Sequence, residues 1–304
     1  MSTAEVDRTA ADPLAPEGSS PSARRPRSAQ QRSSRWATVV RTVIVLVIGL
    51  LTISPLYWML AVAFSTRSEL LSGGDFRLWP RELTLENFER VFGSFPVATW
   101  FGNSVAIAVV VTALSVATSL LAGYAFAQLR FPGSTALFFV ALATLVLPVQ
   151  VIMVSLFRLI TGLGLYGTYW GVILPSAASA FGLFLARQFI LGIPRELIEA
   201  ARLDGASHFQ IFLRIVLPMS KSLIAVLVFM GLLQSWNDFA WPLIALKENQ
   251  LFTLPIGLLF LQGQANSDYG ATMAFALINV VPIAIVFLFF QKYFIAGFAR
   301  SGIK

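Results

Sequence analysis

Six long apolar segments recur along this chain and constrain its fold more than any other feature. The first runs from about Thr42 to Phe64. As an α-helix it is about 33 Å long, enough to cross the hydrocarbon core of a bilayer. Further apolar runs lie near residues 101–127, 135–160, 168–190, 221–246 and 270–291. Because lipid offers the backbone no hydrogen-bond partners, such runs predict helices. We therefore expect an all-α polytopic membrane protein with six transmembrane helices.

The composition supports a membrane protein and argues against several kinds of chemistry. Hydrophobic residues make up 57% of the chain and charged residues 12%, whereas about a quarter of a soluble domain is charged. Cysteine is absent and His208 is the one histidine, which argues against disulfides and a metal centre. The sequence contains no G-x-x-x-x-G-K-[ST] motif and no nucleophile–base set. We therefore expect no enzyme activity, no cofactor and no ATP bound by this chain itself.

The N-terminal segment differs in composition from the rest. Residues 1–35 are rich in Ser, Ala, Pro and Arg and have few large apolar side chains. Such a segment cannot bury enough surface to fold, so we predict a disordered cytoplasmic tail. Residues 36–304 then form the transmembrane domain. The first apolar run is too long for a cleaved signal peptide and has no small-residue cleavage site after it, so we interpret it as a signal anchor.

The basic residues indicate the orientation of the chain. Most of the 22 lysines and arginines lie in segments that share a side with the N-terminus. They lie in the tail, at Arg130, between Arg187 and Lys221, and from Lys292 onward. Because cytoplasmic loops of membrane proteins carry an excess of Lys and Arg, both termini are predicted to be cytoplasmic.

Small residues and prolines mark special positions in the apolar segments. One stripe of small residues follows successive i+4 steps: Ser115, Ser119, Gly123 and Ala127. Such a stripe lets another helix approach closely, although the ordinary composition of a membrane helix also explains it. Prolines inside apolar segments remove a backbone donor and predict kinks. These prolines are Pro55, Pro148, Pro175 and Pro282.

A polar loop, residues 191–219, separates the fourth apolar run from the fifth and predicts two short helices. Pro194 suits the first turn of the first helix, and Gly205 suits a left-handed end. Ser207 and Gln210 form a capping-box pattern for the second helix. The predicted faces are Leu197, Ala200, Ala201 and Asp204 on the first helix, and Phe209, Phe212, Leu213 and Val216 on the second. Pro218 is predicted to close the second helix. A pair of amphipathic helices lying on the membrane surface is the alternative interpretation.

The spacing in this loop resembles a family signature. Glu199-Ala200-Ala201, three residues, Gly205, nine residues and Ile215-x-Leu217-Pro218 are similar to the signature of permease subunits of binding-protein-dependent ABC importers. The resemblance implies that the first short helix is a coupling helix docked on a cytoplasmic ATPase, with Glu199 against a basic residue. The residues it assigns to ATPase coupling are Glu199, Ala200, Ala201, Asp204, Gly205, Ile215, Leu217 and Pro218.

The same resemblance implies a set of partners and a location. An importer of this kind needs a second permease subunit, two ATPase subunits that bind the ATP, and an extracytoplasmic solute-binding protein. Its location is the cytoplasmic membrane of a prokaryote.

Other segments are similar to one branch of the family, the carbohydrate-uptake permeases of the maltose transporter type. They are Trp79-Pro80, Thr84 to Phe88, Ser235 to Phe239 with Pro242, and Gly297 to Lys304. The chain resembles the shorter of the two unlike permeases of such an importer. This resemblance implies import of a mono- or oligosaccharide. It departs from the pattern at Met219 to Ser222, where relatives often carry another proline. Two alternatives remain: a permease for glycerol phosphate, a polyamine or phosphate, and a carrier driven by an ion gradient. The carrier would require several ionisable residues in the spans and an inverted repeat, and neither is evident.

Residues near the end of the fifth apolar run are candidates for contact with the solute. A sugar needs hydrogen-bonding groups and an aromatic face, and the residues that offer both are Trp236, Asn237, Asp238 and Trp241. The alternative places both tryptophans in the interfacial belt and Asp238 at a helix kink. Gln150 and Asn279, each close to a proline, are weaker candidates for lining the pathway.

Overall fold

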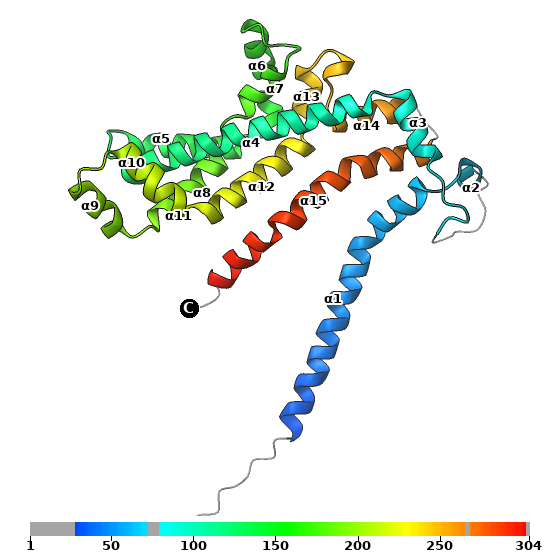
Figure 1. Ribbon diagram of the computed structural model, residues 1–304, viewed down its shortest axis with the longest axis horizontal. Coiled ribbons are helices and arrows are strands. Elements are labelled where there is room, and N and C mark those ends of the chain that lie inside the picture. Colours follow the sequence, from blue (N-terminus) through cyan, green and yellow to red (C-terminus); the bar gives the residue numbers. More distant parts are fainter. Residues whose placement is uncertain (1–27, 72–78, 265–267, 302–304) are drawn as a thin grey trace, which may run out of the picture. The chain divides into compact units, whose positions relative to one another are not determined.

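The computed structural model describes residues 28–71, 79–264 and 268–301 and contains no β-strand within these ranges. Residues 1–55 and 56–304 form two separate units, each considered by itself. The first helix begins at Ser28, inside the segment predicted to be a disordered tail. The rest of the predicted tail, residues 1–27, lies outside the described residues. Figure 1 shows the order of the helices.

The described helices, with short 3₁₀ and π segments, follow one another with few long loops. Their bounds are α1 (Ser28–Ala63), α2 (Arg67–Leu71), α3 (Glu86–Ser94), α4 (Val97–Gln128), α5 (Ser134–Ala143), η1 (Thr144–Val146), α6 (Val149–Gly162), α7 (Tyr169–Ser176), α8 (Ala180–Leu191), α9 (Arg195–Leu203), α10 (His208–Ile211), the π segment η2 (Phe212–Val216), α11 (Leu217–Met219), α12 (Lys221–Asn237), α13 (Ala240–Ala245), η3 (Asn249–Leu251), α14 (Leu254–Gln264) and α15 (Tyr269–Ser301).

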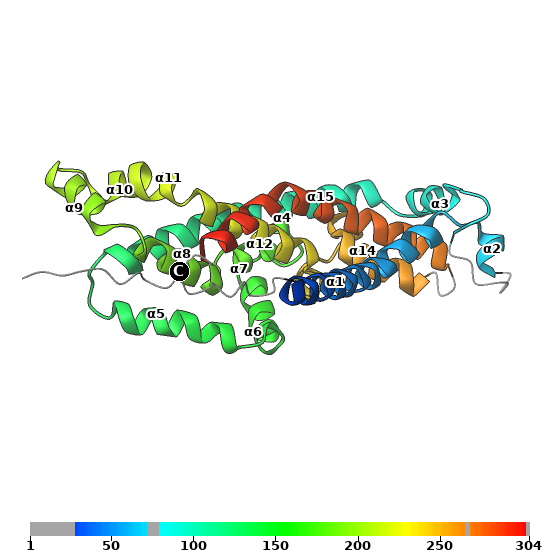
Figure 2. The ribbon, with the colours of Figure 1, turned by 90° about the horizontal axis from the view of Figure 1, so that it is seen from below.

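Four of the six predicted spans are single segments long enough to cross a membrane in the described part of the chain, and two are bent pairs of helices. The four single segments are Trp36–Ala63, Val97–Gln128, Tyr169–Leu191 and Tyr269–Lys292, of which Tyr169–Leu191 is interrupted between α7 and α8. The third apolar run is two helices that meet at 107°, as Figure 2 shows for α5 and α6. Pro148 lies at this bend. It has no backbone N–H to donate to the preceding turn, so the helix cannot continue regularly through it. The all-helical fold class is therefore confirmed, with up to six spans if each bent pair is one span.

The fifth span differs from the prediction of one helix over 221–246. It ends at Asn237, and the chain then turns before α13. Pro242 cannot donate the i→i−4 hydrogen bond to Asp238, and an Asp238 carboxylate oxygen accepts from the Trp241 N–H at 3.4 Å instead. The prediction of a continuous helix was wrong because an aspartate and a proline at this spacing end it together.

The beginning of the fifth span is also bent, at the point where the sequence departs from the family pattern. The helical segments His208–Met219 and Lys221–Asn237 meet at 79°. Ser220 lies between them, fully buried, and its hydroxyl donates to the Val216 carbonyl at 2.7 Å. The Val216 carbonyl also accepts from the Ser220 backbone N–H at 3.0 Å, so the hydroxyl adds a second hydrogen bond to this carbonyl and is itself satisfied at the bend.

The centre of residues 56–304 is α4, a 32-residue helix that packs against α7, α8 and α12. Figure 1 shows α4, α8 and α12 running alongside one another. The small-residue stripe makes this packing close. A Cβ added to Gly123 would lie 2.5 Å from the Ala186 Cβ, and one added to Gly182 would lie 2.2 Å from the Ser119 hydroxyl oxygen. The stripe therefore marks a helix–helix interface within this chain.

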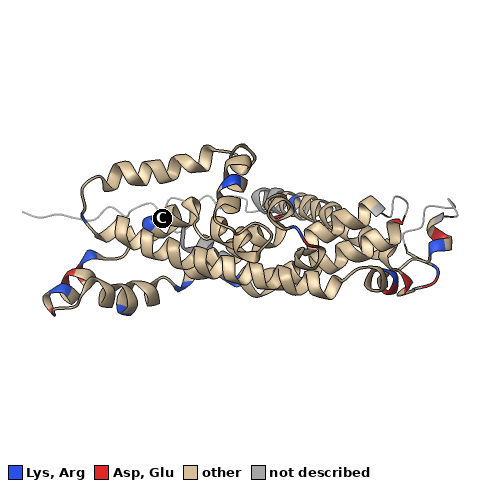
Figure 3. Ribbon diagram, turned by 90° about the horizontal axis from the view of Figure 1, so that it is seen from above, with Lys and Arg blue, Asp and Glu red and all other residues tan. Residues whose placement is uncertain are grey.

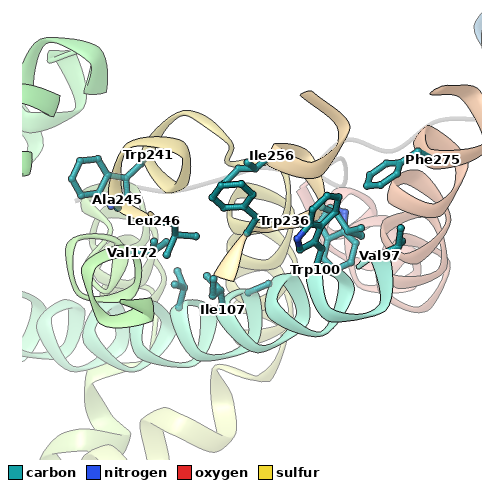
Figure 4. Close-up of a cluster of buried hydrophobic side chains, with 14 of the residues drawn as sticks. Val97, Trp100, Ile107, Val172, Trp236, Trp241, Ala245, Leu246, Ile256 and Phe275 are labelled. Atoms are coloured by element: carbon teal, nitrogen blue, oxygen red, sulfur yellow. The ribbon is translucent and has the colours of Figure 1, made fainter. Parts of the chain in front are cut away.

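A large hydrophobic cluster joins α4 to the segments on either side of α13. Figure 4 shows Trp100, Trp236, Ile256 and Phe275 among its members. The Trp100 indole N–H donates to the Asn249 carbonyl at 2.7 Å. The Asn103 side-chain amide donates to the Gln250 and Phe252 carbonyls in the same way, so the cluster buries Trp100 without leaving its N–H group unsatisfied.

At the α3 end of this unit, polar side chains hold three helices together. The Asn87 side chain is fully buried and donates to the carbonyls of Ala63 and Ser65 at 2.9 and 2.8 Å. Arg90 pairs with Asp268, just before α15, and with Glu86 on its own helix. Asn87 belongs to the segment Thr84 to Phe88, which resembles carbohydrate-uptake permeases. In the structure its side chain joins α3 to the end of α1 through these hydrogen bonds.

We expect the Arg90–Asp268 pair to stabilise the protein in a pH-dependent way. Burial by itself raises the pKa of Asp268, but the Ala271 N–H and Arg90 outweigh it and hold that pKa below its usual range. A carboxylate with a lowered pKa stabilises the fold above its unfolded pKa of about 4, and this stabilisation is lost as the pH falls through the folded value. Asp268→Asn should therefore cost about 1 kcal/mol near neutral pH and less near the folded pKa.

The measurement is the thermal unfolding midpoint of the purified protein in detergent at pH 7 and at about pH 3. Glu89→Gln is the matched control, because it removes an exposed carboxylate from α3, the helix that carries Arg90. An equal loss for Asp268→Asn at both pH values, or no loss at either, would contradict the prediction.

Candidate functional site

The loop over residues 191–219 folds as the two predicted short helices. Pro194 lies at the N-cap of α9, one position before the predicted first turn, with Glu196 in the first turn and Arg202 in the last. These charges complement the helix dipole. Gly205 follows α9 with φ +81°, the left-handed conformation predicted for it. An L-residue with a Cβ is strained there, so glycine sets the turn between the helices.

The second short helix begins with the predicted capping box. The Ser207 hydroxyl accepts from the Gln210 N–H at 3.3 Å, and the Gln210 side-chain oxygen accepts from the Ser207 N–H at 2.8 Å. Two backbone donors at the start of α10 are satisfied reciprocally. This prediction is confirmed.

The first short helix packs on the protein through Ile198, and most of the shallow face predicted for docking is exposed. Ile198 is fully buried and Ala201 is half-buried beside it, whereas Leu197 is exposed. Ala200 is exposed, so the pair of alanines does not form one surface. The members of the predicted coupling set that are exposed here are Glu199, Ala200, Asp204 and Gly205.

Leu203 is the most exposed large apolar residue of this loop and was missed by the sequence analysis. Its side chain is 90% exposed at the end of α9. It follows Ala200 by three residues, so both lie on the outward face of the helix. This spacing was the signal that could have found it.

The apolar stripe of the second helix was predicted only in part. Phe212 and Val216 are buried as expected, but Phe209 is 65% exposed and Leu213 is also exposed. Ile211 is buried instead. A π segment with a wider turn, Phe212–Val216, follows Ile211 directly.

Pro218 explains the wider turn and does not close the helix as predicted. It lies inside α11, where its ring has no N–H to donate toward Arg214. The remaining residues of the family signature follow this geometry: Ile215 and Leu217 are half-buried and Pro218 is exposed.

Tyr124, near the end of α4, connects this helix to the loop over residues 191–219. Its hydroxyl lies 3.3 Å from the His208 Nδ1, and its ring centroid lies 5.4 Å from that of Phe212. Arg187 on α8 donates to the Phe126 carbonyl at 3.3 Å and lies over the Phe138 ring. Because packed side chains do not deform continuously, a displacement of α10 would be passed to α4 through Tyr124.

The two tryptophans proposed for solute contact are core residues. Trp236 and Trp241 are both buried in the hydrophobic cluster (Figure 4). The Trp236 indole donates to the Asn279 carbonyl at 3.0 Å, and the Trp241 indole donates to the Gly171 carbonyl at 3.1 Å. Their aromatic faces are packed and their N–H groups are paired. The prediction is therefore corrected, because neither indole is free to contact a solute in this conformation.

The other four candidates lie on different elements, except that Asn237 and Asp238 are neighbours at the end of α12 and Asn279 lies beside Trp236. Asn237 is exposed, and its amide donates to the Leu233 carbonyl within its own helix at 2.8 Å. Asp238 is half-buried at the turn described above, and Gln150 is exposed at the start of α6. The Asn279 side-chain oxygen is buried and has no hydrogen-bond partner in the described structure. The structure thus does not bring the predicted set together as one site.

A cavity that the sequence analysis missed lies between α4, α8 and α12, with a mixed apolar and polar lining. Its volume is about 170 Å³. The polar residues that line it are Ser115, Ser119, Ser179 and Gln234. The Ser119 side chain is 2% exposed, and its hydroxyl has no hydrogen-bond partner in the described structure. The i+4 serines on α4 were in the sequence stripe, but only the fold shows that Gly182 leaves room beside them.

Charges and metal-binding groups are sparse between the two ends of this unit. Figure 3 shows acidic and basic residues gathered around α9 and around α2 and α3, with few on the helices between. Among the described residues, no group of three or more His, Asp or Glu side chains is placed to hold a metal ion. These features define a polytopic helical membrane protein with one organised polar loop.

The family follows from comparison with known proteins. Residues 115–300 match the family described as "Binding-protein-dependent transport system inner membrane component". The chain belongs to this family of membrane permeases. The match covers the loop, the cavity and the last four spans.

Relatives and solved structures agree with this assignment. The chain is 41% identical over 260 residues to the arabinooligosaccharides transport system permease protein AraQ of Halalkalibacterium halodurans, covering 84% of this chain and 93% of that protein. It is 32% identical over 267 residues to the lactose transport system permease protein LacG of Rhizobium radiobacter, covering 88% and 97%. In fold it is similar to a bacterial ABC transporter involved in the import of the acidic polysaccharide alginate, with a TM-score of 0.75, 23% identity, and coverage of 86% of this chain and 98% of that chain.

Proposed function

We propose that this chain is one transmembrane subunit of an ATP-driven importer that carries a mono- or oligosaccharide across the cytoplasmic membrane. The observation that supports this most is its 41% identity, over nearly the whole of both chains, to a permease named for arabinooligosaccharide transport. The named lactose permease supports the same class of solute. The chain itself performs no catalysis in this proposal.

The loop around Glu199 to Gly205 couples the chain to its energy source. Its exposed charged and apolar groups, Glu199, Asp204 and Leu203, suit a docked protein surface, and Tyr124 connects it to α4. Two partner ATPase subunits bind the ATP, and Glu199 meets a basic residue of one of them. Ile215, Leu217 and Pro218 shape the bend through which the motion reaches α12.

Two further partners complete the proposal. A second permease subunit encloses the pathway with this chain, and an extracytoplasmic binding protein delivers the solute. The binding protein is supported by the similar fold of an alginate transporter, which was solved with an alginate-bound periplasmic protein, at a TM-score of 0.63. Both termini of this chain face the cytoplasm.

The mechanism is alternating access. The ATPase subunits close on ATP and move the coupling loop, and the helices then turn the pathway toward the outside. Hydrolysis resets them. The coupling energy comes from the different affinity of the ATPase subunits for nucleotide in the two conformations.

Two experiments test the proposal in order. The chain is first purified from its native membranes through an N-terminal tag, and the proteins present in stoichiometric amount are identified. A second permease and an ATPase support the importer, and a chain that is alone, stable and still active in transport contradicts it. The assembled complex is then reconstituted in vesicles with ATP inside and tested for uptake of labelled arabinotriose, lactose and sn-glycerol 3-phosphate.

Glycerol phosphate is the second candidate solute. The chain is 30% identical over 270 residues to the sn-glycerol-3-phosphate transport system permease protein UgpE of Brucella abortus. The lower identity favours a sugar. Uptake of sn-glycerol 3-phosphate alone would reverse this order, and uptake driven by an ion gradient without ATP would exclude both.

A further inference from the structure

We propose that the cavity between α4, α8 and α12 is a subsite that binds the hydroxyl groups of one ring of a neutral sugar as it crosses the membrane. This inference rests on the proposed function and specifies which part of this chain touches the solute. It places the contact away from Trp236 and Trp241, where the sequence predicted it.

The cavity has an unpaired hydroxyl group in its wall and a volume that suits one sugar ring. The Ser119 hydroxyl is buried and without a partner, and Ser115 lies one helical turn away on the same wall. A buried hydroxyl without a partner costs about 1–3 kcal/mol, so this geometry favours a bound polar group. A cavity of about 150 Å³ holds a benzene ring, and the cavity here is about 170 Å³.

Glycines and a broken helix keep the cavity open. Any side chain at Gly182 would collide with the Ser119 hydroxyl, and a Cβ at Gly231 would lie 3.0 Å from the Thr112 side chain. The wall from α8 begins at Ser179, directly after the break that separates α7 from α8. The Thr118 hydroxyl donates to the Ala177 carbonyl in this break at 2.8 Å. Irregular backbone at membrane depth is tolerated where it is buried in protein or lines a water-filled cavity.

The exposed Gln234 amide favours a cavity that opens away from lipid. Gln234 lies on its rim and is exposed. An exposed amide within a span has no hydrogen-bond partner in hydrocarbon, so its place is in a pathway or against another subunit. Met230 and Phe181, on the same rim, supply the apolar contact that the C–H face of a sugar needs.

The lining also distinguishes between the two candidate solutes. None of the described residues that line the cavity is charged. A phosphate group is bound by Arg, Lys or a helix N-terminus, since its charge must be compensated away from water. Serine hydroxyls and an amide, which both donate and accept, match the hydroxyl groups of a neutral sugar.

The chain contains no cysteine, so single cysteines report on the cavity without background from this subunit. Ser115→Cys and Ser119→Cys change one atom and are made in the assembled transporter in vesicles. Each is labelled with a small hydrophilic methanethiosulfonate reagent, with and without arabinotriose, and the label on this chain is measured by mass spectrometry. Only a thiol in contact with water reacts, because the thiolate is the reactive form. Val109→Cys is exposed on the same helix but outside the lining and is the matched control.

We expect the Ser115-derived thiol to react readily and the Ser119-derived thiol, at a side chain that is 2% exposed, to react more slowly. Arabinotriose should slow both reactions by about tenfold, a coupling of about 1.4 kcal/mol. The control thiol should show no such protection, and sn-glycerol 3-phosphate should protect neither position. Gln234→Leu should raise the concentration of arabinotriose needed for protection by about tenfold, while Gln188→Leu, an exposed glutamine of α8, should not.

Four results would overturn the subsite. They are thiols that do not react, thiols that arabinotriose leaves unprotected in a complex that imports it, equal protection of Val109→Cys, and equal protection by sn-glycerol 3-phosphate. Uptake by the unmodified complex separates this test from the proposed function. A complex that imports arabinotriose without protection contradicts the subsite alone, and a complex that imports no sugar contradicts both.

Discussion

Glu199→Lys should abolish coupled transport while the chain still inserts and assembles in the membrane. Glu199 is exposed on α9, so its replacement removes no contact within this chain. In the proposed function it meets a basic residue of an ATPase subunit, and a lysine there would place two like charges together. Breaking such a pair at an interface costs about 2–5 kcal/mol, which corresponds to a loss of at least about thirtyfold in coupling. The measurement is ATP hydrolysis stimulated by the loaded binding protein, with uptake measured in the same vesicles.

Glu196→Lys is the matched control for this charge reversal. Glu196 is exposed on the same helix, in its first turn. A positive charge there opposes the helix dipole, so this variant disturbs α9 itself more than Glu199→Lys does. We expect it to keep most of the stimulated hydrolysis. Unchanged stimulated hydrolysis in Glu199→Lys, or equal losses in both variants, would contradict a specific role for Glu199.

Gly123→Ala should destabilise the folded chain more than any other exchange of one hydrogen for one methyl group along α4. The added Cβ would lie 2.5 Å from the Ala186 Cβ and 2.9 Å from the Arg187 backbone nitrogen. Backbone cannot rotate away as the end of a flexible side chain can, so α4 and α8 must move apart. Overpacking of this kind costs about 1–3 kcal/mol. The expected result is a lower thermal unfolding midpoint and less monodisperse protein after extraction into detergent.

Gly102→Ala makes the same change elsewhere on the same helix. Nothing lies within 4 Å of the Cβ that this variant adds. Because alanine favours a helix over glycine by up to about 1 kcal/mol, the control should be neutral or slightly stabilised. A similar midpoint for the two variants would show that close packing of α4 on α8 does not govern stability.

Local chemistry explains why the coupling loop was predictable. Gly205 needs a left-handed backbone, and the Ser207–Gln210 capping box uses groups three residues apart. These features depend on neighbours in the sequence, and no distant contact competes with them. The exposed charges of α9 have the same origin, since Glu196 and Arg202 act on their own helix.

The solute contacts were less predictable, because they depend on which residues distant helices bring together. Trp236 and Trp241 are amphipathic residues that suit either a sugar site or a core. Their indole N–H groups found carbonyls on α15 and α7, and only the fold could supply these partners. Ser119, in contrast, has no partner because Gly182 faces it from another helix.

The sequence by itself determined the helical class, the approximate spans and the loop signature. Apolar length, proline positions and short-range spacing act within one segment, where the energy of a helix in lipid is decided. The tertiary structure decided where spans break, which faces are buried and where the cavity lies. Ile211 is buried in place of Phe209, and the Gly182–Ser119 contact shaped the cavity. Packing between helices depends on the shapes of both surfaces, and one segment of sequence describes only one of them.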